Sequence, residues 1–188
     1  MVDARIQKSK DALILSGLNL INKNKEVSIT EIAKDAKVGR ATLYRLFSSK
    51  EVLVEAIALH CVNIFTETTA PIDKLAKSHL HAIALLFEFA LPLTQESQFL
   101  ASLEYFSEKI PEVESIIAQQ DQALLALFEG AKAEGSIDKN IPTSWLLNLV
   151  EGLFFAGWLQ QTKNGMSAKQ TAELAFNCFV GAVTNKTN

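Results

Sequence analysis

The sequence predicts an all-α protein, and three observations lead to that prediction. Apolar residues recur at intervals of three and four along most of the chain, which places them on one face of a helix. Proline and glycine number only 4 and 8 in 188 residues, and several stand where one helix would end and the next begin. No segment shows the sustained alternation of apolar and polar residues that is typical of a strand.

Three helices are expected in the first fifty residues. The first covers about residues 3–21, with an apolar face of Ile6, Leu13, Gly17, Leu20 and Ile21. "NKNKE" ends it. The second lies in "SITEIAKDAKV", where Ser28 and Glu31 have the spacing of a capping box. A turn at Val38-Gly39 leads to the third helix, "RATLYRLF".

A longer helix follows this group. "SSKE" has the spacing of a second capping box, formed by Ser48 and Glu51, and would open a helix through "VLVEAIALHCVNIF". Further helices are expected between Pro71 and Pro92, in "TQESQFLASLEYFSEK", from Pro111 to Gly135, from Pro142 to Gly165, and in "SAKQTAELAFNCFVGAVT".

Charge separates the two ends of the chain. Residues 1–50 contain ten Lys and Arg against five Asp and Glu, whereas the remainder contains eight against sixteen, so a net charge of −3 conceals a basic N-terminal quarter. Such a distribution indicates that one end binds a polyanion. No apolar run of about 18 residues and no apolar leader stand out. With only two cysteines, we expect a cytoplasmic protein without a disulfide framework.

The spacing of the second and third helices is that of a helix-turn-helix, whose second helix reads base edges in the major groove of DNA. Arg40 can form a bidentate contact with guanine, and Thr42 can bind a base or a phosphate. Tyr44, Arg45 and Lys50 offer a hydroxyl and positive charge to phosphates, and Ala41 lets the backbone come close. Leu43, Leu46 and Phe47 would face inward.

"SITEIAKDAKVGRATLYRLFSSKEVLVEAI", residues 28–57, resembles the N-terminal signature of the TetR/AcrR family of transcriptional regulators. The resemblance implies a homodimer in which residues 1–48 form a DNA-binding domain and residues 49–188 a ligand-binding and dimerisation domain. It also places Ser28 and Thr30 near the DNA and Lys50 over the phosphates. The last two long helices would form the four-helix bundle of the dimer.

Two sites are expected in the larger domain. Its many aromatic rings favour a packed core, yet they could also enclose an apolar pocket, for which the candidate lining residues are His81, Phe87, Glu88, Phe106 and Trp158. The last two helices carry small residues and more apolar surface than one core needs. The candidate dimer residues are Leu146, Leu149, Leu153, Phe176, Phe179 and Val180.

The sequence therefore predicts a ligand-responsive DNA-binding regulator that acts as a repressor. A hydrophobic or aromatic molecule would release it from a near-palindromic operator by shifting the helix that starts at Ser49. No cofactor or metal is expected, because His79 and His81 are two residues apart and point to different faces of a helix. Cys61 and Cys178 could sense redox state, although a buried small residue is the ordinary interpretation. No enzyme motif was found. The alternative is a helical ligand-binding or protein-interaction module that no longer binds specific DNA.

Overall fold

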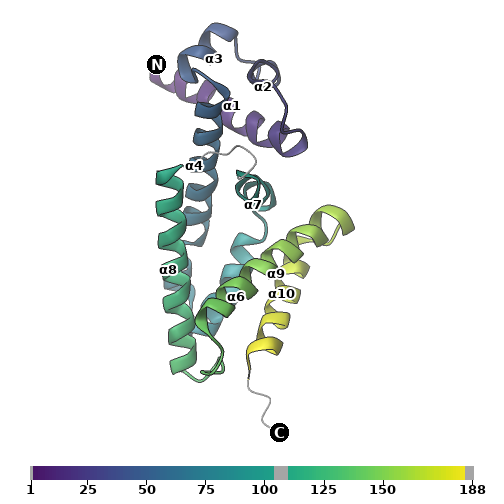
Figure 1. Cartoon of the computed structure of the whole chain (residues 1–188). Helices are drawn as coiled ribbons and strands as arrows, with labels where there is room; N and C mark the ends of the chain where they lie inside the picture. Colours follow the sequence, from purple (N-terminus) through teal and green to yellow (C-terminus); the bar gives the residue numbers. More distant parts are fainter. Residues whose placement is uncertain (1, 104–109, 185–188) are drawn as a thin grey trace. The chain divides into compact units, whose positions relative to one another are not determined.

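The computed structural model describes residues 2–103 and 110–184, and within these ranges it contains helices and no strand (Figure 1). This confirms the all-α prediction. The helices are α1 (Val2–Lys23), α2 (Ile29–Asp35), α3 (Arg40–Leu46), α4 (Lys50–Thr69), α5 (Ile72–Leu75), α6 (His79–Ala90), α7 (Thr94–Ala101), α8 (Pro111–Ala133), α9 (Thr143–Asn164) and α10 (Ala168–Val183).

The chain packs as two compact units, each formed from two separate stretches of sequence. The head unit comprises Met1–Ile64 and Gln95–Glu114, and the body unit comprises Phe65–Thr94 and Ser115–Asn188. Helix α7 belongs to the head unit although the sequence places it in the middle of the chain. The sequence predicted a boundary after Ser48 between a DNA-binding domain and a ligand-binding domain. The packing of the chain does not test such a functional division, so this boundary remains a prediction.

The start of α2 is fixed by the expected capping box. The backbone N–H of Glu31 donates to the Ser28 hydroxyl at 3.2 Å, and the Ser28 N–H donates to the Glu31 carboxylate at 2.8 Å. The Ser28 hydroxyl also donates to that carboxylate at 2.7 Å, and this bond, together with the bond from the Ser28 N–H, lowers the pKa of Glu31. The cap satisfies backbone donors that a helix of seven residues cannot satisfy internally.

The turn between α2 and α3 begins earlier than expected. The N–H of Val38 donates to the carbonyl of Ala33 at 2.9 Å, and the N–H of Lys37 donates to the carbonyl of Lys34 at 3.2 Å. This is the Schellman arrangement, in which the residue after the C-cap is left-handed. That residue is Lys37, with φ of 55°. At the end of α8 the equivalent residue is Gly135, with φ of 77°, as the sequence predicted.

The expected capping box of Ser48 and Glu51 is wrong by one residue. Helix α4 begins at Lys50, and the N–H of Val52 donates to the Ser49 hydroxyl at 3.4 Å. The Ser49 carbonyl accepts from the N–H of Leu53, so Ser49 is the N-cap. The "SSKE" sequence offers two neighbouring hydroxyls, and local spacing alone does not choose between them.

The expectation about apolar runs also needs correction. By length and composition alone, Lys50–Leu75 is apolar enough to cross a bilayer. Seven of its residues are buried inside the protein: Leu53, Val54, Ile57, Ala58, Cys61, Val62 and Ile72. Such burial is the ordinary reason for this composition in a core helix.

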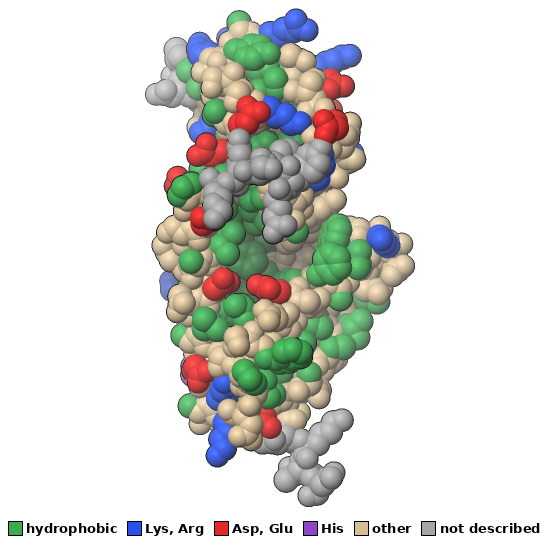
Figure 2. Space-filling view, in the orientation of Figure 1, with side chains coloured by type: hydrophobic (Ala, Val, Ile, Leu, Met, Phe, Trp, Pro, Cys, Tyr) green, Lys and Arg blue, Asp and Glu red, His purple; other side chains and the backbone are tan. Residues whose placement is uncertain are grey.

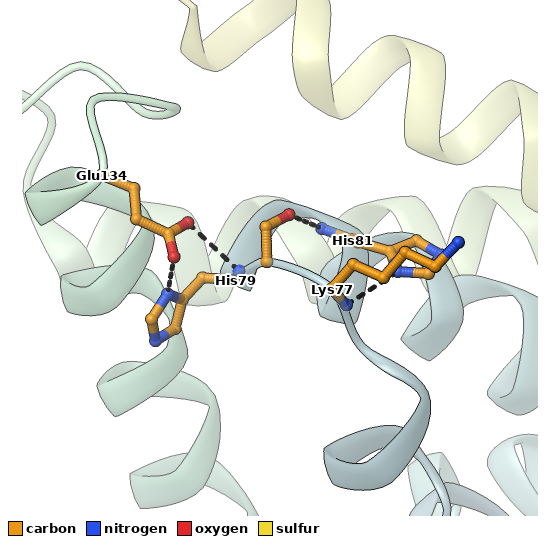
Figure 3. A network of polar contacts seen from close by, with 5 residues as sticks. Lys77, His79, His81 and Glu134 are labelled. Carbon is orange, nitrogen blue, oxygen red and sulfur yellow. Dashed lines mark hydrogen bonds and ion pairs between the residues drawn. The ribbon is translucent and has the colours of Figure 1, made fainter.

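The single helix expected between Pro71 and Pro92 is two helices. The short α5 ends at Leu75, and Ser78 caps α6 by accepting from the N–H of His81 at 3.1 Å. Glu134, after the end of α8, accepts from the backbone N–H of His79 at 3.2 Å and contacts its ring Nδ1 at 2.6 Å. Figure 3 shows the backbone N–H and the ring Nδ1 of His79 directed at this carboxylate. The break is therefore held by a residue far along the chain.

The core of the body unit is a cluster of rings and aliphatic side chains from α6, α8, α9 and α10. The ring of Phe87 lies 5.2 Å from that of Phe154 and 6.2 Å from that of Phe179. Gly157 permits a close approach of neighbouring segments, because a Cβ there would lie 2.5 Å from Leu91 and 2.9 Å from Thr171. Among the described residues, Gly152 and Gly181 have no such neighbours within 4 Å.

Replacing Lys37 by glycine should stabilise the protein. A side chain in the left-handed conformation costs about 1–2 kcal/mol, part of which is offset by the greater freedom of glycine in the unfolded chain. We expect Lys37→Gly to raise the free energy of unfolding by about 0.5–1 kcal/mol in urea denaturation. Lys37→Ala is the control, since it removes the charge but keeps the Cβ, and it should leave stability nearly unchanged. Equal stabilisation by both variants would contradict the backbone explanation.

Candidate nucleic-acid interface

Helix α3 has one buried face and one exposed face, divided as the sequence predicted. Leu43 is fully buried, Phe47 directly after the helix is 2% exposed, and Leu46 is half-buried. Tyr44 is 51% exposed, so it is not part of the core. The cause is helical geometry, because residues three and four apart share a face.

The exposed face of α3 carries the residues expected to contact DNA. Arg40, Ala41, Tyr44 and Arg45 are all exposed, and their spacing keeps them on one side of the helix. Thr42 is half-buried and lies between the two faces. Two guanidinium groups and a phenol on one short helix can bind bases and phosphates together.

The two residues expected to contact DNA at the start of α2, Ser28 and Thr30, differ in their exposure to solvent. The Ser28 hydroxyl accepts from the Glu31 N–H and lies 2.7 Å from the Glu31 carboxylate and 3.1 Å from the Thr30 hydroxyl. Ser28 is thus engaged in its own cap, although it is exposed. Thr30 is half-buried beside it. Their contact with DNA remains a prediction.

Lys50 has a structural partner that the sequence did not reveal. Its ammonium group donates to the backbone carbonyl of Lys25 at 2.6 Å, and the residue is half-buried. The bond ties the first residue of α4 to the loop between α1 and α2. No local signal could have shown it, since the partners are 25 positions apart. A phosphate contact by Lys50 would have to coexist with this bond.

Other cations of the helix-turn-helix were not among the predicted site residues. Lys34 and Lys37 are exposed at the end of α2 and in the turn before α3. Figure 2 shows Lys and Arg side chains over the α1–α3 part of the head unit, with Asp and Glu side chains among them. Four exposed cations on α2, the turn and α3, namely Lys34, Lys37, Arg40 and Arg45, outnumber the exposed carboxylates of α2, Glu31 and Asp35. The exposed charge of this surface therefore suits a polyanion.

The residues proposed for a ligand pocket are placed differently from one another. Phe87 is fully buried among core rings, whereas Glu88 beside it is exposed. His81 is half-buried, and its Nδ1 accepts from the N–H of Lys77 at 3.1 Å. Trp158 is half-buried, and its indole Nε1 is buried without a hydrogen-bond partner in the described part of the chain. Phe106 lies outside the described residues.

The residues proposed for a dimer interface divide between core and surface. Leu146 and Phe179 are fully buried in the core of the body unit, so their side chains are not available to a partner. Leu149, Leu153 and Phe176 are half-buried against that core, and Val180 is also half-buried. The exposed apolar side chains of α9 and α10 are instead Trp145, Phe155 and Leu174, at 63%, 57% and 47%.

The histidine and cysteine residues have separate environments. His79 and His81 bind different partners, and within residues 2–103 and 110–184 no three His, Cys, Asp or Glu residues form a metal-sized group. Burial raises the pKa of the Cys61 thiol to about 12, which leaves it an unreactive small hydrophobe. Cys178 is exposed on α10.

Residues 25–57 match the family model described as "Bacterial regulatory proteins, tetR family". The matched range contains α2, α3 and the first residues of α4, which are the elements described above. This match confirms the resemblance that the sequence predicted. A comparison with curated protein sequences finds no match.

Solved structures of regulators share the fold of nearly the whole chain. The TetR-like regulator LfrR of Mycobacterium smegmatis in complex with proflavine has a TM-score of 0.78 at 19% identity, covering 97% of this chain and 99% of its own. A TetR-family regulator of Marinobacter aquaeolei has a TM-score of 0.80 at 19% identity, covering 98% and 100%. KstR2 of Mycobacterium tuberculosis has 0.77 at 15%, covering 94% and 95%. At these identities the likeness shows the fold alone.

Removing Arg40 should relax the choice of base at one position of the bound site. A bidentate arginine discriminates against a wrong base by about 1–3 kcal/mol. We therefore expect Arg40→Ala to weaken binding to the duplex that the wild-type protein selects by about 1–3 kcal/mol. Its binding to random duplex should change little. The control is Lys139→Ala, which removes one exposed positive charge in the loop before α9. Equal losses on both duplexes would show that Arg40 contacts only the backbone of the DNA.

Proposed function

We propose that this chain, a member of the tetR family by its helix-turn-helix, is a ligand-responsive DNA-binding transcriptional regulator. The observation that carries the proposal is the coincidence of the matched residues 25–57 with the exposed face of α3. Arg40, Tyr44 and Arg45 project from a helix whose other face is buried, as a recognition helix requires. The regulators of similar structure are not described as enzymes.

We propose repression with release by a small molecule as the mode of action. One regulator of similar fold was solved with proflavine, and another is described as a ketosteroid transcriptional regulator. The body unit here is rich in aromatic side chains, which suits a hydrophobic or aromatic effector. The effector would act only through a difference in its affinity for the two states of the protein.

Trp158 supports a ligand site in the body unit. A buried indole N–H ordinarily has a hydrogen-bond acceptor, and leaving it without one costs about 1–3 kcal/mol. In the described structure this N–H has none. An effector with an aromatic body and one acceptor atom would satisfy it.

We also propose a homodimer formed by α9 and α10. Trp145, Phe155 and Leu174 leave large apolar surfaces exposed on these two helices, and Figure 2 shows hydrophobic side chains at the surface along α9. Gly152 and Gly181 face open space, which would let a partner helix approach closely. Two recognition helices related by a two-fold axis would read a near-palindromic site.

Selection of genomic fragments tests the function directly. At about physiological salt, the purified protein should enrich a near-palindromic site, and its affinity should fall steeply as salt increases because phosphate contacts release counterions. The variant Arg40→Ala, Arg45→Ala serves as a negative control in the same selection. If the wild-type chain enriches no sequence and binds without salt dependence, the helical module that no longer binds specific DNA becomes the better description.

A charge on the exposed face of α10 should prevent dimer formation. In Leu174→Lys, burial of the interface would place an unpaired ammonium group in an apolar contact. Light scattering should then report the mass of one chain where the wild type has the mass of two. Leu75→Lys is the matched control, because Leu75 on α5 is 51% exposed and Leu174 is 47% exposed. Wild-type mass in Leu174→Lys, or an equal change in both variants, would contradict this interface.

A further inference from the structure

Lys25 lies between two helices that approach the same loop from different parts of the sequence. Its backbone carbonyl accepts from the Lys50 ammonium group at the start of α4, at 2.6 Å. Its own ammonium group donates to the Ser102 hydroxyl, just after α7, also at 2.6 Å. Partial burial lowers the pKa of Lys25. The loop that carries this residue ends at Ser28, the N-cap of α2.

Helix α7 makes further polar contacts with the end of α1. The side-chain amide of Asn22 donates to the carbonyl of Gln95 at 2.9 Å, and the side chain of Gln98 donates to the carbonyl of Asn22 at 3.3 Å. Ser102 in turn donates to the carbonyl of Phe99 at 2.7 Å, and Phe99 is fully buried. The hydroxyl that receives Lys25 is thereby fixed to the anchored part of α7. We call the contacts of Asn22 and Lys25 with Gln95, Gln98 and Ser102 the α7 clamp.

Helix α7 is also connected by chain to the body unit at both ends. The chain leaves the body unit after Thr94, passes through α7 in the head unit, and re-enters the body unit at Ser115 within α8. Three residues, 91–93, separate α6 from α7, and α8 begins in the head unit at Pro111. The clamp joins α7 to the loop before α2, to which Lys50 at the start of α4 is also bonded.

We propose that Lys25 is a positioning residue for DNA recognition, which sets the start of α2 according to the position of α7. This inference rests on the proposed function and adds a second path between effector site and DNA. Lys25 acts through Ser102 and through its own backbone, and its ammonium group is directed at α7. It differs in this respect from the exposed cations of α2 and α3.

The clamp has the composition of a contact that opens reversibly. Its bonds are polar, and water can replace each partner when the polar residues of α7 shift while the Phe99 ring stays buried. The side-chain oxygen of Asn22 is buried without a partner in the described structure, so the closed clamp leaves one acceptor unsatisfied. Opening the clamp would hydrate that oxygen and offset part of the lost bonds.

The test removes the acceptor of Lys25 without changing any charge. We expect Ser102→Ala to lower affinity for the selected duplex roughly three- to thirtyfold with an unchanged salt slope, and Ser102→Thr to restore it. Ser97→Ala is the matched control on α7, since Ser97 has no side-chain hydrogen bond in the described structure. An unchanged affinity in Ser102→Ala overturns the proposal. So does a salt slope that falls by about one in Lys25→Met, since Lys25 would then bind phosphate.

Hydrogen exchange distinguishes this inference from the proposed function. Coupling is reciprocal, so the selected duplex should slow amide exchange in α7 as well as in α3 of the wild type. In Ser102→Ala the protection of α3 should persist while that of α7 is lost. Protection of α3 without α7 in the wild type overturns the positioning role alone. Protection of neither helix overturns the proposed function and this inference together.

Discussion

A helix of seven residues cannot maintain its shape in water, and this constraint governs the head unit. Isolated helices shorter than about 12–15 residues are marginal, because nucleation is costly and few bonds follow it. Helices α2 and α3 each have seven residues. They persist because Ile32, Leu43 and Phe47 are buried in the head unit. The orientation of the exposed side chains of α3 is therefore set by the packing of its buried face with α1 and α2.

The features that could be predicted from the sequence are those whose interacting residues lie close together in the chain. The Ser28–Glu31 cap and the glycine after α8 lie within a few positions of the groups they satisfy. The two faces of α3 follow from a spacing of three and four. Prediction failed where the local pattern allowed two solutions. The "SSKE" sequence has two candidate caps, and a left-handed Lys37 carries none of the signal that a glycine would give.

The structural features that could not be predicted depend on contacts between residues far apart in the sequence. The break before α6 is held by Glu134, which is 55 positions from His79, and Lys50 binds a carbonyl that is 25 positions away. Leu146 and Phe179 are apolar residues on the last two helices, as are Trp145 and Leu174, yet only the first two are core. Composition cannot separate a core face from a face exposed on the same helix. Tertiary packing makes that choice.

The nature of the contacts between α7 and the α1–α2 loop bears on how an effector could act. Removing a buried aliphatic side chain from a core costs about 2–5 kcal/mol, whereas a single hydrogen bond contributes about 1 kcal/mol net. Allosteric coupling energies are typically 1–3 kcal/mol. An effector with that difference in affinity could open a few hydrogen bonds to Asn22 and Lys25, but it could not open the core around Leu43 and Ile57. A change within the head unit that opens these polar contacts of α7 and leaves the buried core intact is consistent with both limits.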